Sequence, residues 1–555
     1  MRLQMAIALV LVLCLLIAAQ IPAPAAASEA NYYYGESLSV HSLLVALHRC
    51  LEANKVLKLS SGSYHGYRSC LADDFIDIEK TAFTIWYEYV PLYELTDLPE
   101  FLKLAEESAV FLLHTQNKSN VPETRGGWVY LWDYTADAPK STTINTIATA
   151  CSVFALARLY EATHNTTYLY GAKLGAEWLI RNIETHGGAI SWDYDWSTSS
   201  WNDLVSPNSF YALTALAYLY KITGNTTYLN YAERLASWIL NLPREHSALF
   251  LTYNITSGQN TTDKLYPHYT LETAEGFYWL YKLTGNTTYL DFFETVLESM
   301  MTFFYAGNGL IYDKYDTSSG SFTDYCMTLS TRQLAFLFLD LYCLTRNQTY
   351  LDWAKLFLNS TIFFQLDTFL RGTWFFYQFP NGTAYRPEYN VTWGYYTYAA
   401  VKYLRSFITP PYCLYAGADV LEHDFDFVWK ELRITINTTE LTTLVINASS
   451  YGMPTAVVIP GASLVSPLPT WEDFIKADYE CWYYSSTTNL VYIKVRGHSP
   501  VLVKVVWAGQ GGPTPGPTPP GQPPRAGRQE QTRLFIAAVV VALIAIVVFV
   551  VRKKP

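Results

Sequence analysis

The ten residues Tyr220-Lys-Ile-Thr-Gly-Asn225-Thr-Thr-Tyr-Leu229 occur four times in the chain with small changes. The other copies are residues 160–169, 281–290 and 342–351, and a weaker copy occupies 93–102. The Asn of the motif recurs at 165, 225, 286 and 347, a spacing of 60 or 61 residues. A fixed period of this kind indicates one supersecondary unit that is used repeatedly, with neighbouring units burying each other's apolar faces.

Each unit reads as a helical hairpin with a tight turn. Apolar residues recur at helical spacing before and after the motif, and Gly224 interrupts them. Gly224 suits the left-handed residue that ends a helix, and Asn225 suits the N-cap of the next one. In the weaker copy Pro99 falls in the first helical turn, where its missing N–H costs nothing.

The number of hairpins predicts the architecture. First helices are expected to begin near Glu79, Thr143, Pro207, Thr270, Thr328 and Trp393, and second helices near Pro99, Thr166, Thr226, Thr287 and Gln348. The amphipathic stretch 38–57 supplies a sixth second helix. We therefore predict a mainly α-helical closed ring of six inner and six outer helices, because the unpaired helices at its two ends complement each other. An open solenoid is the competing arrangement.

The segments around the repeats indicate a secreted, anchored protein. Residues 1–27 have the features of a signal peptide, and 28–411 form the ring. Alternating apolar and polar residues predict a β-sandwich over 412–509. A Pro/Gly-rich linker follows at 510–533, then a transmembrane helix at 534–551 and a basic cytoplasmic tail at 552–555. The body would then lie outside the cell.

Other sequence features agree with export. Twelve Asn-x-Ser/Thr sequons are predicted glycosylation sites: Asn117, Asn165, Asn225, Asn254, Asn260, Asn286, Asn347, Asn359, Asn381, Asn390, Asn437 and Asn447. Cys50 with Cys70 and Cys413 with Cys481 are candidate disulfides, although connectivity does not follow from sequence. The composition is typical of an archaeal envelope protein. We expect no metal and no cofactor, and the net charge of −10 with scattered Lys and Arg argues against nucleic-acid binding.

The connections between hairpins are long and rich in aromatic and acidic residues, which indicates a functional face. They lie at the end of the ring opposite the tight turns. Flat aromatic rings stack on sugars and carboxylates bind sugar hydroxyls, so we expect a carbohydrate ligand in the mouth of the ring. The predicted binding residues are Asp133, Trp192, Asp195, Tyr266, His268, Asp313, Arg332 and Trp374. A purely structural role for any single aromatic, and a solvated turn for any single Asp, are the alternatives.

The predicted ring resembles the (α/α)6-toroid enzymes that act on carbohydrates. The segment Gly307-Asn-Gly-Leu-Ile-Tyr312-Asp313, followed by Asp324-Tyr325-Cys-Met-Thr328, is similar to the C-terminal domain of D-glucuronyl C5-epimerases. This resemblance implies that Tyr312 and Tyr325 handle the C5 proton of a uronyl residue. Leu329 stands where that family has a histidine.

The sequence leaves the reaction open. Epimerisation would use Tyr312 and Tyr325, whereas hydrolysis or lysis of a glycosidic bond would use acids such as Asp193 and Glu272. Glu275 lies three residues from Glu272 and hence on the same helix face. Favourable placement of these two charges against the helix dipole is the structural alternative. A non-catalytic glycan-binding or scaffold protein of the envelope is the alternative of another class.

Overall fold

The structure is a computed structural model. It describes residues 38–70, 73–365, 374–375, 377–378, 380, 390–391, 394–427, 429–459, 465–497 and 499–508. The predicted signal peptide, linker, transmembrane helix and cytoplasmic tail lie outside these residues. Among the residues that are described, no helix has both the length and the apolar character to cross a membrane.

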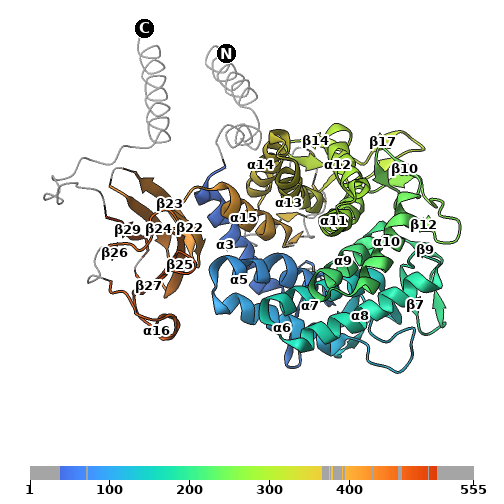
Figure 1. Cartoon of the computed structure of the whole chain (residues 1–555), viewed down its shortest axis with the longest axis horizontal. Coiled ribbons are helices and arrows are strands. Elements are labelled where there is room, and N and C mark those ends of the chain that lie inside the picture. Colours follow the sequence, from blue (N-terminus) through green and yellow to red (C-terminus); the bar gives the residue numbers. More distant parts are fainter. Residues whose placement is uncertain are drawn as a thin grey trace, which may run out of the picture. The chain divides into compact units, whose positions relative to one another are not determined.

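Two rings of helices build the main body (Figure 1). The inner helices are α4 (Ile78–Phe83) continued by η1 (Thr84–Tyr89) and α5 (Val90–Thr96), α7 (Thr146–Thr163), η2 (Pro207–Phe210) with α9 (Tyr211–Thr223), α11 (Pro267–Thr284), α13 (Thr328–Thr345) and α15 (Tyr395–Phe407). The outer helices are α3 (Val40–Leu57), α6 (Pro99–Thr115), α8 (Thr166–Thr185), α10 (Thr226–Leu240), α12 (Thr287–Thr302) and α14 (Gln348–Phe363). Almost every side chain of α7, α9 and α13 is buried, whereas α8 and α10 bury one face.

The inner ring is closed. Successive inner helices pack against each other from α4 to α15, and α15 packs in turn against η1, α5 and α3. The Tyr396 hydroxyl donates a hydrogen bond to the Leu43 carbonyl and ties the last helix to the first one described. The open solenoid is therefore excluded, and the chain has the (α/α)6 toroid architecture.

The repeated motif forms the tight turns as predicted. Gly224 ends α9 with φ +68°, and Gly285 ends α11 with φ +70°. The Asn225 side chain then accepts a hydrogen bond from the Thr227 N–H and caps α10. Every outer helix from α6 to α14 begins at the predicted residue. The inner helices α7 and α11 begin three residues away from prediction, at Thr146 and Pro267.

The long connections form a belt of short antiparallel pairs at the N-terminal ends of the inner helices. The strand before an inner helix pairs with the next connection: β3 (Ile76–Asp77) with β4 (Leu131–Asp133), β6 (Thr143–Asn145) with β7 (Asp193–Asp195), β9 (Leu204–Val205) with β12 (Tyr253–Asn254), β13 (Lys264–Leu265) with β16 (Tyr315–Asp316), and β18 (Cys326–Met327) with β20 (Tyr377–Gln378). Figure 1 shows β7, β9 and β12 together at one side of the ring. Neighbouring repeats are thus joined at the mouth by backbone hydrogen bonds.

Further short strands complete the connections. They are β1 (Lys58–Ser61), β2 (Tyr64–Tyr67), β5 (Ala138–Pro139), β8 (Ser200–Trp201), β10 (Arg244–Glu245), β11 (Ala248–Leu249), β14 (Tyr305–Gly307), β15 (Leu310–Ile311), β17 (Ser321–Phe322), β19 (Trp374–Phe375) and β21 (Asn390–Val391). Three of the connections fold into short hairpins, β4–β5, β7–β8 and β16–β17.

The strands after the ring form two four-stranded sheets. One has the order β22 (Tyr412–Ala416), β25 (Thr442–Asn447), β28 (Leu490–Val495), β27 (Cys481–Ser485), and the other β23 (Asp419–Asp426), β24 (Glu431–Asn437), β29 (Val501–Val506), β26 (Ala456–Val458). A short helix, α16 (Trp471–Lys476), precedes β27. Alternate side chains of β24 and β29 are buried, which is the period-two pattern seen in the sequence.

The predicted disulfides are wrong. Cys50 is a free, buried thiol on α3, and the Thr397 hydroxyl points at its sulfur, so Cys50 does not pair with Cys70. Cys413 and Cys481 are also free and buried. They lie on β22 and β27, the two outermost strands of one sheet. Two intervening strands hold them too far apart for a disulfide, which requires Cα atoms within about 7 Å.

Candidate active site

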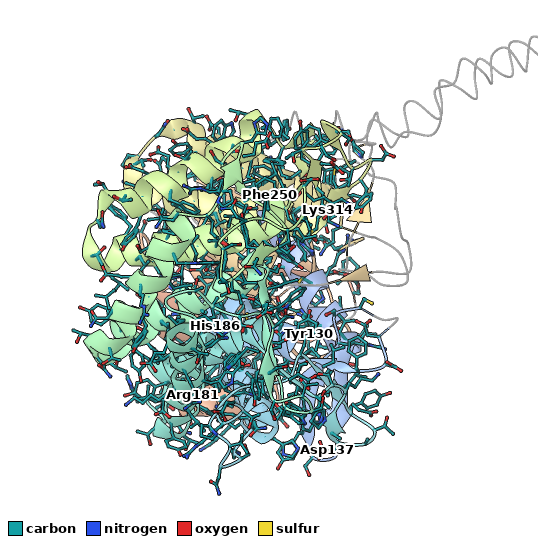
Figure 2. The ribbon with its side chains drawn as sticks, turned by 90° about the vertical axis from the view of Figure 1, so that its right-hand side faces the viewer. Tyr130, Asp137, Arg181, His186, Phe250 and Lys314 are labelled. Atoms are coloured by element: carbon teal, nitrogen blue, oxygen red, sulfur yellow. The ribbon has the colours of Figure 1, made fainter. Side chains whose placement is uncertain are left out.

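The belt end of the ring carries a cluster of buried titratable side chains, three carboxyl groups and one imidazole. We call it the mouth cluster: Glu79, His268, Glu272 and Asp313. Glu79 lies in α4, His268 and Glu272 in α11, and Asp313 in the connection between α12 and α13. Their exposed fractions are 6%, 3%, 1% and 1%. Figure 2 looks onto the face of the belt and labels Tyr130 and Lys314, which come from two different connections.

His268 and Glu272 form a pair one helical turn apart. The His268 Nε2 atom lies 3.2 Å from Glu272 Oε1. Burial lowers the pKa of His268 to about 3, and the positive charge of Arg332 acts in the same direction. Burial also raises the pKa of Glu272 well above its usual range, while the neighbouring Tyr395 hydroxyl opposes that shift. At neutral pH the imidazole of the pair is therefore neutral, and burial favours the protonated form of the Glu272 carboxyl group.

Asp313 has a different partner. The Lys314 ammonium group lies 3.2 Å from Asp313 Oδ2 and 5.0 Å from the centre of the Tyr266 ring. Burial raises the pKa of Asp313, and the charge of Lys314 opposes that shift by favouring the carboxylate. Among the described residues no ammonium group acts on Glu272, so Glu272 and Asp313 are held in different environments.

Glu79 adds a second acid with a raised pKa to the cluster. Burial raises the pKa of Glu79 well above its usual range, and the charges of Asp77 and Glu272 add to that shift. The Tyr130 hydroxyl opposes it as a hydrogen-bond partner. Asp77 itself caps α4 by accepting from the Lys80 N–H at 2.9 Å, and burial raises its pKa to about 6.

Several buried polar atoms of this region lack a hydrogen-bond partner among the described residues. They include Glu272 Oε2, Asp313 Oδ1 and both polar atoms of the Gln333 amide. A buried polar group without a partner costs about 1–3 kcal/mol. Unsatisfied donors and acceptors close to an acid pair are therefore expected where a polar ligand or water supplies the missing bonds.

The register of the repeats explains how these side chains meet. The residue that immediately follows an inner helix is a common reference point for the repeats. Thirteen residues before it, five of the inner helices place a side chain on the ring axis: Cys151, Tyr211, Glu272, Gln333 and Tyr395. Ten residues back, the next layer contains Tyr87, Phe154, Thr214, Glu275, Phe336 and Tyr398. Six residues back lie Arg158, Tyr218, Trp279, Asp340 and Lys402. Equivalent repeat positions thus carry unlike residues, which makes a single asymmetric site.

Four of the predicted site residues gather in or beside the mouth cluster: Tyr266, His268, Glu272 and Asp313. Arg332 is fully buried on α13, where its Nη2 donates to the Thr328 hydroxyl and where burial lowers its pKa to about 9. Its charge acts on both His268 and Glu88, so it lies between the mouth cluster and the inner face of η1.

Two predicted catalytic residues lie at the edge of the cluster. The half-buried Tyr312 ring stacks on Phe322 at 4.6 Å. Tyr325 is also half-buried, and its carbonyl accepts a hydrogen bond from the Asp313 N–H at 3.1 Å. Its backbone therefore helps to position Asp313.

The predicted acids and aromatics of the first connections do not join the cluster. Asp133 Oδ1 accepts from the Thr135 N–H and Asp195 Oδ1 from the Ser197 N–H, so both close the turns of their own hairpins. This is the solvated-turn role of Asp that the sequence offered as the alternative. Asp193 and Trp192 are half-buried in the belt, and burial raises the pKa of Asp193. The side chain of Trp374 is outside the described part of the structure.

Sequence reasoning missed Glu79, Tyr130 and the axial tyrosines. Glu79 stands in the first turn of a helix, where an acid ordinarily serves the helix dipole. Tyr87, Tyr211 and Tyr395 are hidden among 45 tyrosines. The repeat register is the signal that finds them, because each occupies an axial position equivalent to that of Glu272 or Glu275.

Comparisons with known proteins agree with this fold. Residues 178–324 match the family described as Glycosyl hydrolase family 76. No curated protein sequence matches the chain. Among solved structures, a cellobiose 2-epimerase from Bacillus thermoamylovorans superposes with a TM-score of 0.56 at 15% identity, covering 65% of this chain and 98% of that one.

Two further structures represent other reactions. A D-mannose isomerase has a TM-score of 0.54 at 14% identity, with 66% of this chain and 97% of that chain covered. A family 76 α-mannanase from Bacteroides thetaiotaomicron has a TM-score of 0.52 at 18% identity, with 66% and 95% covered. The resemblance to the (α/α)6-toroid carbohydrate-active enzymes is confirmed. At these identities the solved structures show a shared fold, and not a shared reaction.

Proposed function

We propose that the protein is a carbohydrate-active enzyme whose substrate, an oligo- or polysaccharide, binds at the mouth cluster. The observation that carries this proposal is that the mouth cluster holds two unlike acids among polar atoms that lack partners in the described residues. Burial favours the protonated form of Glu272, whereas the Lys314 ammonium group 3.2 Å from Asp313 favours its carboxylate. The half-buried Tyr130 and Lys314 on the same face add an aromatic surface and a charge. The match to Glycosyl hydrolase family 76 spans His268, Glu272 and Asp313 and supports the proposal.

The reaction that this geometry supports best is hydrolysis of a glycosidic bond. Such hydrolysis uses a neutral carboxyl group that protonates the leaving oxygen and a carboxylate that activates water or attacks the sugar. Glu272 fits the first role because burial favours its protonated form. Asp313 fits the second because Lys314 favours its ionised form.

Epimerisation is the second candidate. It requires a base that removes a proton next to a carbonyl or carboxylate group. His268 is the candidate base by position, because its imidazole is neutral and its Nε2 atom lies 3.2 Å from Glu272 Oε1, but burial lowers its pKa to about 3 and makes it a weak base. In a uronyl C5-epimerase of the kind that the sequence resembles, Tyr312 and Tyr325 would exchange the proton instead. The stacking of Tyr312 on Phe322 favours His268 over these tyrosines.

Product analysis with matched variants tests both reactions. The body comprising residues 28–508 is incubated with a panel of mannan, glucan and uronan oligosaccharides, and products are identified by mass and by NMR. Glu272→Gln and Asp313→Asn are expected to lower kcat about 10²- to 10⁴-fold. Asp316→Asn is the control, because Asp316 closes a hairpin turn by accepting from the Ser318 N–H. New reducing ends support hydrolysis, and products of unchanged mass support epimerisation.

Two outcomes would contradict the enzyme proposal. If Glu272→Gln and Asp313→Asn turned over a substrate as fast as the parent, catalysis would not lie at the mouth cluster. If the parent bound a glycan of the panel but converted none, the protein would be a glycan-binding or scaffold protein of the envelope.

We also propose that the protein is displayed on the cell surface by its C-terminal apolar segment. Residues 1–27, 510–533 and 534–551 support this proposal through their sequence alone. Protease treatment of intact cells tests it: the body should be released, and the segment 534–555 should stay with the membrane fraction. Recovery of the intact chain from the soluble fraction would refute it.

A further inference from the structure

A chain of tyrosine hydroxyls runs through the centre of the ring, away from the mouth. The Tyr395 and Tyr211 hydroxyl oxygens lie 3.0 Å apart, and those of Tyr211 and Tyr87 lie 3.3 Å apart. The Tyr87 hydroxyl donates to Glu275 Oε2 at 2.6 Å. At its outer end Tyr395 lies beside Glu272. These five side chains come from η1, α9, α11 and α15. All five belong to the first two layers of side chains on the ring axis, the layers thirteen and ten residues back.

We propose that the hydroxyls of Tyr395, Tyr211 and Tyr87 form a proton relay that connects Glu272 at the mouth with Glu275 in the ring centre. This inference rests on the proposed function of Glu272 as an acid. It assigns a role to a second buried carboxyl group that the hydrolysis itself does not require.

The surroundings of the chain support a relay over a set of isolated contacts. Tyr87, Tyr211 and Tyr395 are at most 1% exposed, and their rings pack on Phe83, Trp86 and Phe336. Bulk water therefore does not compete for their hydroxyls. A hydroxyl both donates and accepts, so a row of three can pass a proton in either direction without moving a heavy atom.

The transfer is balanced in atoms and charge. When Glu272 has given its proton to the leaving oxygen, Tyr395 donates its proton to Glu272 and receives one from Tyr211. The Tyr87 hydroxyl, which donates to Glu275 Oε2 at rest, first turns its proton toward Tyr211. Tyr211 then receives that proton, and Tyr87 receives one from the protonated Glu275. Four O–H bonds break and four form, and the negative charge moves from Glu272 to Glu275. The proton released by the attacking water returns the relay to its first state.

The groups around Glu275 act on its charge in both directions: burial and the charges of Asp340 and Glu272 raise its pKa, whereas the Tyr87 hydroxyl and Lys402 lower it. Glu275 is faced by Tyr87 from η1, Tyr211 from α9, Asp340 from α13, Tyr398 and Lys402 from α15, and Glu272 on its own helix. Glu272 is faced by Glu79 from α4, Cys151 from α7, Tyr211 from α9, Tyr395 from α15, and His268 on its own helix. Lys402 lowers the pKa of Glu275 and so helps to hold the charge there, although its ion pair with Asp340 and the burial of Glu275 limit that effect.

Hydrogen–deuterium exchange of the Glu275 carboxyl proton tests the relay without any substrate. Burial raises the pKa of Glu275 to about 8, so the group is protonated at pH 7 and its carbonyl stretch is visible in the infrared. The band is assigned by its loss in Glu275→Gln. After transfer into D2O, Tyr211→Phe is expected to slow the deuterium shift of this band about tenfold or more. A merely loosened core would speed exchange instead.

Tyr67→Phe is the matched control. Tyr67 is a buried tyrosine whose hydroxyl lies 2.8 Å from that of Tyr89, outside the chain of the relay. Its variant loses one buried hydroxyl bond too, and exchange at Glu275 should keep the parent rate. Exchange in Tyr211→Phe as fast as in the parent would overturn the proposal, because the proton would then reach Glu275 by another route.

Kinetics on a converted saccharide give a second readout. Tyr211→Phe should lower kcat about tenfold or more, leave KM unchanged and reduce the solvent deuterium isotope effect, because fewer protons then move in the slow step. The two measurements separate the proposals. Slowed exchange in a protein that converts no saccharide would refute the proposed function and keep the relay, whereas turnover with unslowed exchange would refute the relay alone.

Discussion

Replacement of Lys80 by Met is expected to destabilise the ring in a strongly pH-dependent way. Lys80 Nζ lies 3.4 Å from Glu88 Oε1 and 3.3 Å from Asn54 Oδ1, and the Asn54 amide donates to Glu88 Oε2. The side chains of Lys80 and Glu88 are both 0% exposed. This group joins α3, the sixth outer helix, to η1, which carries Tyr87, so it belongs to the closure of the ring.

The size of the effect follows from the fate of Glu88. Without the ammonium group, the buried carboxylate takes up a proton in the folded state. In the unfolded chain its pKa is about 4.5. Keeping the group protonated at pH 7 then lowers the free energy of unfolding. The loss is about 1.4 kcal/mol for each of the 2.5 pH units between that pKa and pH 7, or about 3.4 kcal/mol. At pH 5 the same calculation gives about 0.7 kcal/mol. In this variant the folded state binds more protons than the unfolded state, so its stability falls as the pH rises.

Urea unfolding at pH 5 and pH 7 measures this difference. Lys80→Met should lose about 3 kcal/mol more at pH 7 than at pH 5, and the double variant Lys80→Met/Glu88→Gln should recover most of the loss at pH 7. Lys55→Met is the control, on α3 next to Asn54, because the Lys55 side chain is 72% exposed and its pair with Glu52 contributes little. An equal cost at both pH values, or no recovery in the double variant, would refute the reasoning.

Three further outcomes are expected. Glu275→Gln should stabilise the protein relative to the parent as the pH rises from about 4.5 to 8. Over that range the Glu275 carboxyl group of the parent keeps its proton in the folded state and loses it in the unfolded state, which costs the parent stability. Melting curves at pH 5 and 8 check this. Gly175→Ala should cost about 1–3 kcal/mol in urea unfolding, because its Cβ would lie 2.5 Å from a methyl group of Val153. In a glycosylating host, peptide mass spectrometry should find a glycan on the exposed cap Asn225 but none on Asn359, which is followed in α14 by the buried Ser360.

The repeat motif predicts most of the fold because its signals are local. A left-handed residue followed by an Asn cap specifies the tight turn wherever it occurs, so the outer helices begin where the sequence places them. The inner helix α7 begins later than predicted because Thr143 first pairs with Asp195 in the belt. A pairing between two distant connections leaves no local signal, and the belt was therefore not predicted.

The site was predicted only where chemistry and position coincide. His268, Glu272 and Asp313 combine a reactive side chain with a place at the start of an inner helix or in a connection. Asp133 and Asp195 have the same chemistry, but their side chains are used by their own turns, and the sequence pattern is the same in both cases. Burial decides the difference, and burial depends on the closed ring.

The position of each acid along its helix explains why burial, and not the helix dipole, sets its charge. The N-terminal ends of six inner helices meet at the mouth, and a helix N-terminus favours a nearby anion by about 0.3–1 kcal/mol, an effect that fades beyond the first turn. Glu272 is the sixth residue of α11 and Glu275 the ninth, so both lie past that turn. His268 is the second residue, where the dipole disfavours imidazolium and acts together with burial. One helix thus keeps its histidine uncharged at the entrance and raises the pKa of two carboxyl groups one and two turns deeper. Acid–base chemistry and a proton relay both require this arrangement.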